Sequence, residues 1–242
     1  MRFIGLGTTT QTPAEACGCG ACTAATLSRR SLFAGAAASL LASAPSHARA
    51  QTDLTPTQAF ARLMEGNQRY AEGRLTSFNG DLAKLRQSTA EKQEPFAAVL
   101  SCSDSRVPVE LVFDQSIGQV FVARVAGNIA DADIIASLEY GAAVLGTKLI
   151  LVLGHANCGA VKAAIQGKAV PGRISALYTA IYPAVEQAGP DLVAVIRANA
   201  RLQARLVRDS SPVISELAKQ GRIDVMAGYY DLASGRVSPI KL

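Results

Sequence analysis

Lys148-Leu-Ile-Leu-Val-Leu153 is the most strand-like run in the chain, and Gly154-His155 follows it at once. A second apolar run, Phe96-Ala-Ala-Val-Leu100, ends two residues before Cys102. Continuous apolar strands of this kind are buried on both faces, which is typical of a parallel sheet covered by helices. We therefore predict an α/β fold with a mostly parallel central β-sheet flanked by α-helices.

The rest of the chain after residue 50 alternates helical and strand signals. Thr55-Pro56 has the pattern of a helix N-cap with proline at the first helical position. Helices are expected over residues 56–72, 81–92, 132–145, 158–167, 173–188, 190–208 and 212–220. Two further strands are expected over residues 119–124 and 223–229, with a turn at Ser234-Gly235.

Two short motifs, Cys102-Ser-Asp-Ser-Arg106 and Gly154-His-Ala-Asn-Cys-Gly159, carry two thiols and an imidazole just past predicted strand ends. In open parallel sheets, ligands bind beyond the carboxyl ends of the strands, where the strand order reverses. Two sulfurs and one nitrogen fill three of the four tetrahedral positions of zinc and leave one for water or a substrate oxygen. We predict that Cys102, His155 and Cys158 bind one Zn²⁺ per subunit; the alternative is a pair of ordinary buried thiols and a core histidine.

The first fifty residues have the pattern of a removable leader. Ser28-Arg-Arg-Ser-Leu-Phe33 resembles a twin-arginine core, the apolar stretch 32–41 is short for a membrane span, and Ala48-Arg-Ala50 is an A-x-A cleavage pattern. We predict that residues 1–50 are a twin-arginine signal peptide that is removed, and that residues 51–242 form one domain. Such a protein is exported and is periplasmic or secreted.

Once the leader is removed, every remaining Cys and His lies in one of the two motifs. The chain has five Cys and two His, and the leader holds Cys17, Cys19, Cys22 and His47. The two remaining Cys and the one remaining His therefore all fall in the two motifs. We interpret the three leader cysteines as inert; the alternatives are a metal clip and a lipidation site.

Charge and hydropathy exclude two classes of partner. The leader carries four of the 24 basic and one of the 19 acidic side chains, so residues 51–242 keep 20 basic and 18 acidic. A nearly balanced charge argues against a nucleic-acid binder with a basic face. No long apolar run follows residue 50, so we expect no membrane span in the mature chain.

The two motifs, about fifty residues apart, resemble those of the β-class carbonic anhydrases, and the resemblance extends over essentially all of residues 51–242. It implies that Asp104 and Arg106 form a catalytic pair beside the zinc, and that the protein is a homodimer or a higher homo-oligomer. It also implies carbon dioxide and bicarbonate as substrate and product.

The resemblance is to the plant-like subtype, in which three further residues shape the substrate pocket across the dimer interface. Their counterparts here are Gln93, Phe121 and Tyr140, and Gly159 is assigned to substrate binding with them. An allosteric subtype has tryptophan and glycine before the first cysteine ligand; the chain has Val99 and Ser101 instead. Arg124 matches an arginine of the allosteric site, and we interpret it as a structural ion pair.

The ligand set implies a mechanism. Zinc lowers the pKa of bound water toward neutrality, and the resulting hydroxide attacks carbon dioxide. Two thiolates cancel the charge of the metal, so the rate should rise into mildly alkaline pH. Two roles are open to Asp104: held by Arg106, it leaves the fourth zinc position free; released, it becomes the fourth ligand of a closed state.

Two alternative functions use the same residues. One is an enzyme of the same fold that hydrolyses carbon disulfide or carbonyl sulfide. The other is a non-catalytic, zinc-stabilised binding module, which would need a fourth protein ligand or a disabled Asp104–Arg106 pair.

Overall fold

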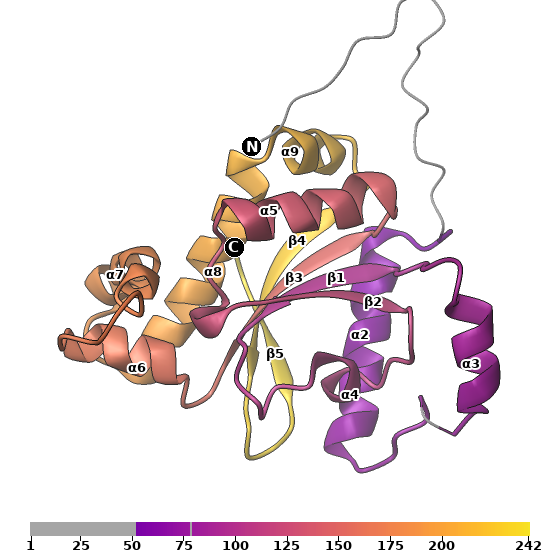
Figure 1. Cartoon of the computed structure of the whole chain (residues 1–242), viewed down its shortest axis with the longest axis horizontal. Coiled ribbons are helices and arrows are strands. Elements are labelled where there is room, and N and C mark those ends of the chain that lie inside the picture. The colour runs from indigo at the N-terminus through magenta and orange to yellow at the C-terminus, as the bar shows by residue number, and fades with distance from the viewer. Residues whose placement is uncertain (1–51, 78) are drawn as a thin grey trace, which may run out of the picture. The chain divides into compact units, whose positions relative to one another are not determined.

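Five strands form one sheet in the order β2-β1-β3-β4-β5 (Figure 1). The computed structural model describes residues 52–77 and 79–242. Strands β1 to β4 are mutually parallel and β5 is antiparallel to β4, which confirms the mostly parallel sheet. The strands are β1 (Ala97–Ser101), β2 (Val120–Arg124), β3 (Leu149–His155), β4 (Asp224–Tyr230) and β5 (Val237–Ile240).

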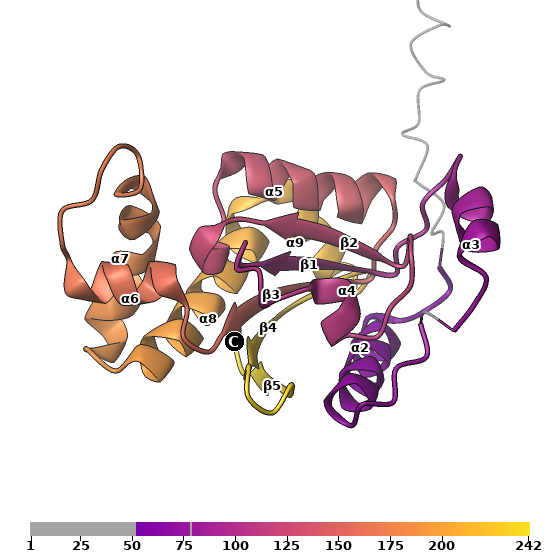
Figure 2. The same ribbon diagram turned by 60° about the horizontal axis from the view of Figure 1, so that its bottom comes forward.

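Helices cover both faces of this sheet (Figures 1 and 2). Helices α2 and α4 pack on one face, and α5, α8 and α9 lie on the other, with α6 and α7 packed beside α8. The α-helices are α2 (Pro56–Ala71), α3 (Leu82–Thr89), α4 (Val109–Val112), α5 (Ala132–Glu139), α6 (Gly159–Gln166), α7 (Ala176–Ala188), α8 (Leu192–Ser210) and α9 (Pro212–Lys219).

Strand β3 shows why the sheet needs helices on both sides. All seven of its residues are buried. Leu149, Leu151 and Leu153 belong to the apolar cluster that contains α2, whereas Ile150 and Val152 belong to the cluster that contains α8. Successive side chains of a strand point to opposite faces, so an uninterrupted apolar run is stable only when both faces are covered.

The helix starts follow local chemistry. Thr55 caps α2 through a reciprocal pair of bonds: its hydroxyl accepts from the Gln58 N–H at 3.2 Å, and the Gln58 side chain accepts from the Thr55 N–H at 2.8 Å. This capping box satisfies N–H groups that have no partner inside the helix. The N-cap predicted at Thr55 is therefore confirmed. Asp side chains cap α3, α5 and α8 by accepting hydrogen bonds from backbone N–H groups of the first turn.

Some elements differ from the sequence-based expectation. The single helix predicted over residues 132–145 ends as an α-helix at Glu139 and continues as a π-helical turn, η2 (Tyr140–Val144). The helix predicted over 81–92 ends at Thr89. Helix α4 and strand β5 were not predicted, because a four-residue helix and a four-residue edge strand containing Pro239 have little periodicity of their own.

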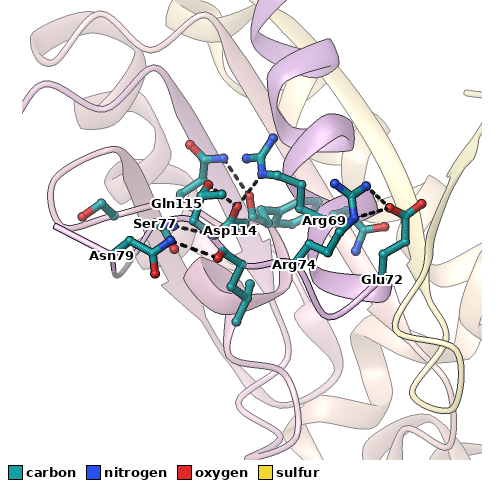
Figure 3. Close-up of polar contacts among 12 residues, drawn as sticks. Arg69, Glu72, Arg74, Ser77, Asn79, Asp114 and Gln115 are labelled. Atoms are coloured by element: carbon teal, nitrogen blue, oxygen red, sulfur yellow. Dashed lines mark hydrogen bonds and ion pairs between the residues drawn. The ribbon is translucent and has the colours of Figure 1, made fainter.

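Asp114 ties the segment after α2 to the turn that follows α4 (Figure 3). Its buried carboxylate accepts from Arg69 Nε at 2.5 Å, from the Thr76 hydroxyl at 2.8 Å and from the backbone N–H groups of Thr76 and Ser77 at 2.9 and 2.8 Å. Burial alone raises the pKa of Asp114, but Arg69 and these donors outweigh it and hold the pKa well below its usual range.

The predicted signal peptide, its cleavage site and the leader cysteines lie outside the residues that the structure describes. Among the described helices, none combines the length and apolar character that crossing a membrane requires.

Candidate metal centre

The sheet register brings the first two predicted ligands to one edge. Strands β1 and β3 are hydrogen-bonded neighbours, with Ser101 opposite Leu153. Cys102 follows β1 directly and His155 is the last residue of β3. The chain leaves β1 toward β2 on one side and returns to β3 on the other, so this is the point at which the strand order reverses. The structure places the ligands where ligands bind in open parallel sheets.

A tight turn adds the third ligand. Asn157, between His155 and Cys158, has φ +54°, in the left-handed region that asparagine tolerates better than most residues. The turn reverses the chain so that Cys158 becomes the N-cap of α6. One ligand atom from each of Cys102, His155 and Cys158 lies within 4.8 Å of the others, and all three residues are buried.

The imidazole of His155 is prepared for a metal. Its Nδ1 donates to the carbonyl oxygen of Ala156 at 2.9 Å, which leaves Nε2 as the unprotonated nitrogen. Nε2 is buried and has no hydrogen-bond partner among the described residues. An orphaned buried nitrogen beside two thiols fits a soft divalent ion such as Zn²⁺, which neutral imidazole and thiolate bind well.

The two thiols are not equivalent. Hydrogen bonds from the Cys158 thiol and from the backbone N–H of Gly127 lower the pKa of Cys102, and they outweigh burial, which raises it. The Cys102 thiolate in turn raises the pKa of Cys158, and this effect outweighs the N–H groups of Val161 and Ala160 at the start of α6. A divalent ion would stabilise both sulfurs as thiolates.

Asp104 and Arg106 form the predicted pair. Arg106 Nε donates to Asp104 Oδ1 at 2.9 Å, Arg106 Nη2 donates to Oδ2 at 2.7 Å, and the Arg106 backbone N–H donates to Oδ1 at 3.0 Å. The guanidinium holds the pKa of Asp104 well below its usual range. Asp104 Oδ2 lies 3.8 Å from His155 Nε2. The carboxylate is thus ionised, clamped and next to the ligand cluster.

Arg124 supports the same segment from β2. It donates to the carbonyl oxygen of Cys102 at 3.1 Å and to that of Asp104 at 2.7 Å. Within the described chain its partners are these backbone oxygens and not a carboxylate, which differs from the ion pair expected from sequence. Sequence reasoning missed this role, because backbone acceptors leave no trace in the side-chain pattern.

The predicted substrate residues lie at the other end of β1. Gln93 precedes β1, and Phe121 in β2 pairs with Ala98, near the amino end of that strand. The rings of Phe121 and Tyr140 have centroids 6.4 Å apart, and Gln93 and Tyr140 line one surface hollow of about 540 Å³. A strand rises about 3.3 Å per residue, so the four residue steps from Ala98 to Cys102 separate this group from the ligands by about 13 Å.

Gly159 is the fourth residue assigned to substrate binding. It is the first residue of α6, directly after Cys158, and it is exposed. A Cβ atom at this position would meet no atom within 4 Å. The chain's own packing therefore does not require glycine here.

Comparisons with known proteins agree with one another. A family model described as carbonic anhydrase matches residues 97–237, more than half of the chain. Carbonic anhydrase 2 of Mycobacterium tuberculosis is 32% identical over 189 residues, which cover 75% of this chain and 91% of that protein.

Solved structures match the fold. The β-carbonic anhydrase CcaA is 25% identical with a TM-score of 0.61, over 74% of this chain and 86% of CcaA. One of two β-carbonic anhydrases from Sordaria macrospora, described as tetrameric, is 23% identical with a TM-score of 0.60, over 76% of this chain and 97% of that chain. The second likeness supports the fold alone.

Proposed function

Because the chain belongs to the carbonic anhydrase family, as a member of its β class, we propose that it binds one Zn²⁺ per subunit and catalyses the reversible hydration of carbon dioxide to bicarbonate and a proton. The observation that carries this proposal is the buried cluster of Cys102, His155 and Cys158 with the clamped Asp104 beside it. Cys102, His155 and Cys158 would hold the ion, which would make water acidic enough to act as a nucleophile.

The chain's own residues prepare that position. Asp104 is ionised and can only accept hydrogen bonds, so it orients the hydroxyl group of a reacting oxygen. Arg106 occupies both carboxylate oxygens and keeps Asp104 from becoming a fourth ligand. This clamped arrangement is the open one of the two roles available to Asp104.

We assign the substrate pocket to two subunits. In one chain Gln93, Phe121 and Tyr140 lie near the amino end of the sheet, whereas the metal ligands lie beyond the carboxyl end. A partner subunit would bring its own group next to these ligands, where the Gln93 amide has both a donor and an acceptor for the substrate oxygens. Val99 and Ser101, in place of tryptophan and glycine, support the plant-like subtype over the allosteric one.

The non-catalytic alternative is weakened by two features. In the part of the chain that the structure describes, the cluster comprises three ligands and no fourth, and the Asp104–Arg106 pair is intact. Hydrolysis of carbonyl sulfide or carbon disulfide needs the same site, so carbonyl sulfide is included in the test as a second substrate.

The experiment is a stopped-flow carbon dioxide hydration assay on purified residues 51–242, with metal content measured in parallel. We expect one zinc per chain, activity that is lost on chelation and returns with Zn²⁺, and a rate that rises into mildly alkaline pH. Zinc-loaded protein that hydrolyses carbonyl sulfide but does not hydrate carbon dioxide would favour the alternative enzyme. Loaded protein inactive on both would favour the binding module.

We further propose that the protein is exported by the twin-arginine route and acts in the periplasm or outside the cell. The Arg29-Arg30 pair, the following apolar stretch and the Ala48-Arg-Ala50 pattern support this. N-terminal sequencing of the exported protein should begin at Gln51, and an Arg29→Lys/Arg30→Lys double variant should stay in the cytoplasm unprocessed. Export of that variant would contradict the proposal.

A further inference from the structure

The loop between β2 and α5 carries a backbone donor to the metal site. The N–H of Gly127 donates to Cys102 Sγ at 3.3 Å. Gly127 has φ +79° and Asn128 has φ +47°, two consecutive residues in the left-handed region. A Cβ atom on Gly127 would lie 2.9 Å from Ile181 Cδ1 and 3.3 Å from Ala160 Cβ. The backbone shape that aims this N–H is one that most sequences avoid.

Two amide side chains of α8 hold the loop in that shape. Asn199 Nδ2 donates to the carbonyl oxygen of Gly127 at 2.9 Å. Gln203 Oε1 accepts from the N–H of Ala130 at 2.9 Å. The two bonds hold the loop on both sides of Asn128, directly after the residue whose N–H contacts the sulfur.

The two amides also hold each other. Gln203 Nε2 donates to Asn199 Oδ1 at 3.2 Å and to the carbonyl oxygen of Ala180, in α7, at 2.9 Å. Asn199 is 0% and Gln203 is 3% exposed. Burying two amides on an otherwise apolar helix face is costly unless their bonds are made. The bonds run without a break from α7 through α8 and the loop to Cys102.

We propose that Asn199 and Gln203 are positioning residues of the metal site, which act through Gly127 on Cys102. They keep the Gly127 N–H hydrogen-bonded to Cys102 Sγ. This hydrogen bond fixes the direction of the sulfur lone pairs and limits the negative charge that the sulfur presents to a bound ion. The proposal rests on the proposed zinc site but does not depend on which substrate the enzyme uses.

The test uses zinc affinity and a cobalt spectrum, and neither depends on turnover. Asn199→Ala and Gln203→Met should each weaken Zn²⁺ binding by about 10- to 100-fold, measured by competition with a chromogenic chelator, as outer-shell substitutions at metal sites do. In the Co²⁺-loaded protein, each should shift the thiolate-to-cobalt charge-transfer band. Since the two amides act through one chain of bonds, the double variant should lose less than the product of the two single effects.

Asn67→Ala is the matched control. Asn67 is also a buried asparagine, at 3% exposed, and bonds to the backbone of Val112, Gly235 and Val237 on the opposite face of the sheet. It should lower stability while leaving zinc affinity and the cobalt band unchanged.

The outcomes separate this inference from the proposed function. If Asn199→Ala keeps the wild-type zinc affinity and cobalt band, the inference is overturned. If Asn199→Ala does not fold, the same result in Gln203→Met overturns it. Equal losses in Asn67→Ala would also overturn it, because the effect would then be general destabilisation. Wild-type protein that binds no zinc would instead refute the proposed function.

Discussion

Arg106 holds both oxygens of Asp104, and its Nη2 also donates to the carbonyl oxygen of Asn157 at 3.3 Å, inside the turn between His155 and Cys158. One guanidinium thus links the two motifs. The planar fork of arginine matches a carboxylate in a way that the single ammonium group of lysine does not.

At this scale we predict that Arg106→Ala lowers kcat by about 10- to 100-fold while zinc stays bound, because the carboxylate loses its orientation and becomes free to reach the metal. Arg106→Lys keeps the charge without the fork and should recover only part of the activity. Measuring carbon dioxide hydration kinetics and zinc content on the same samples tests this prediction. Loss of zinc together with activity would show that Arg106 holds the ligand cluster and does not gate it.

At the scale of elements, the β1–β3 pair and the turn after β3 place the ligands, whereas polar groups around Asp114 hold together α2, the segment directly after it and the turn after α4 (Figure 3). The Asp114 side chain is fully buried and that of Arg69 is 30% exposed. Removing the charge of Asp114 leaves the partly exposed Arg69 guanidinium and the N–H groups of Thr76 and Ser77 without their ionised acceptor.

Asp114→Asn should therefore lower the free energy of unfolding at pH 7 by about 2 kcal/mol. The pKa of Asp114 is lowered in the folded protein, so its contribution is complete above the unfolded value of about 3.9 and is lost as the pH falls toward the folded value. Urea unfolding of both proteins at stepped pH should show that the difference in their free energies of unfolding narrows below about pH 4. A difference that is independent of pH would refute this account.

Asp209→Asn is the control, because the Asp209–Arg208 pair is exposed and contributes little at any pH.

At the scale of the whole molecule, the η2 turn next to the edge strand β2 exposes apolar side chains to solvent. Tyr140 is 47% and Val144 is 50% exposed, and both line the hollow that contains Gln93. An uncovered edge strand next to exposed apolar residues is a surface that proteins usually cover. A second copy is the occupant that would also complete the proposed substrate pocket.

We accordingly predict that the wild-type protein sediments as a dimer or higher oligomer, and that Val144→Glu sediments as a monomer and loses most of the activity. Sedimentation velocity would measure the mass, and circular dichroism would show that the fold is kept. Val213→Glu, at a valine 39% exposed on α9, should leave the assembly intact. An unchanged mass for Val144→Glu would place the interface elsewhere.

The sequence by itself determined the ligand types, the two buried strands that lead to them and the mostly parallel sheet, because side-chain chemistry and hydrophobic periodicity are local properties. Asn199 and Gln203 were visible only as two polar residues, one helical turn apart, within a predicted helix. The tertiary structure decided what they contact, as it decided that Arg124 binds carbonyl oxygens and that Gln93 lies far from the metal ligands of its own chain. Those relations depend on strand order, register and backbone groups far apart along the chain, which no local pattern encodes.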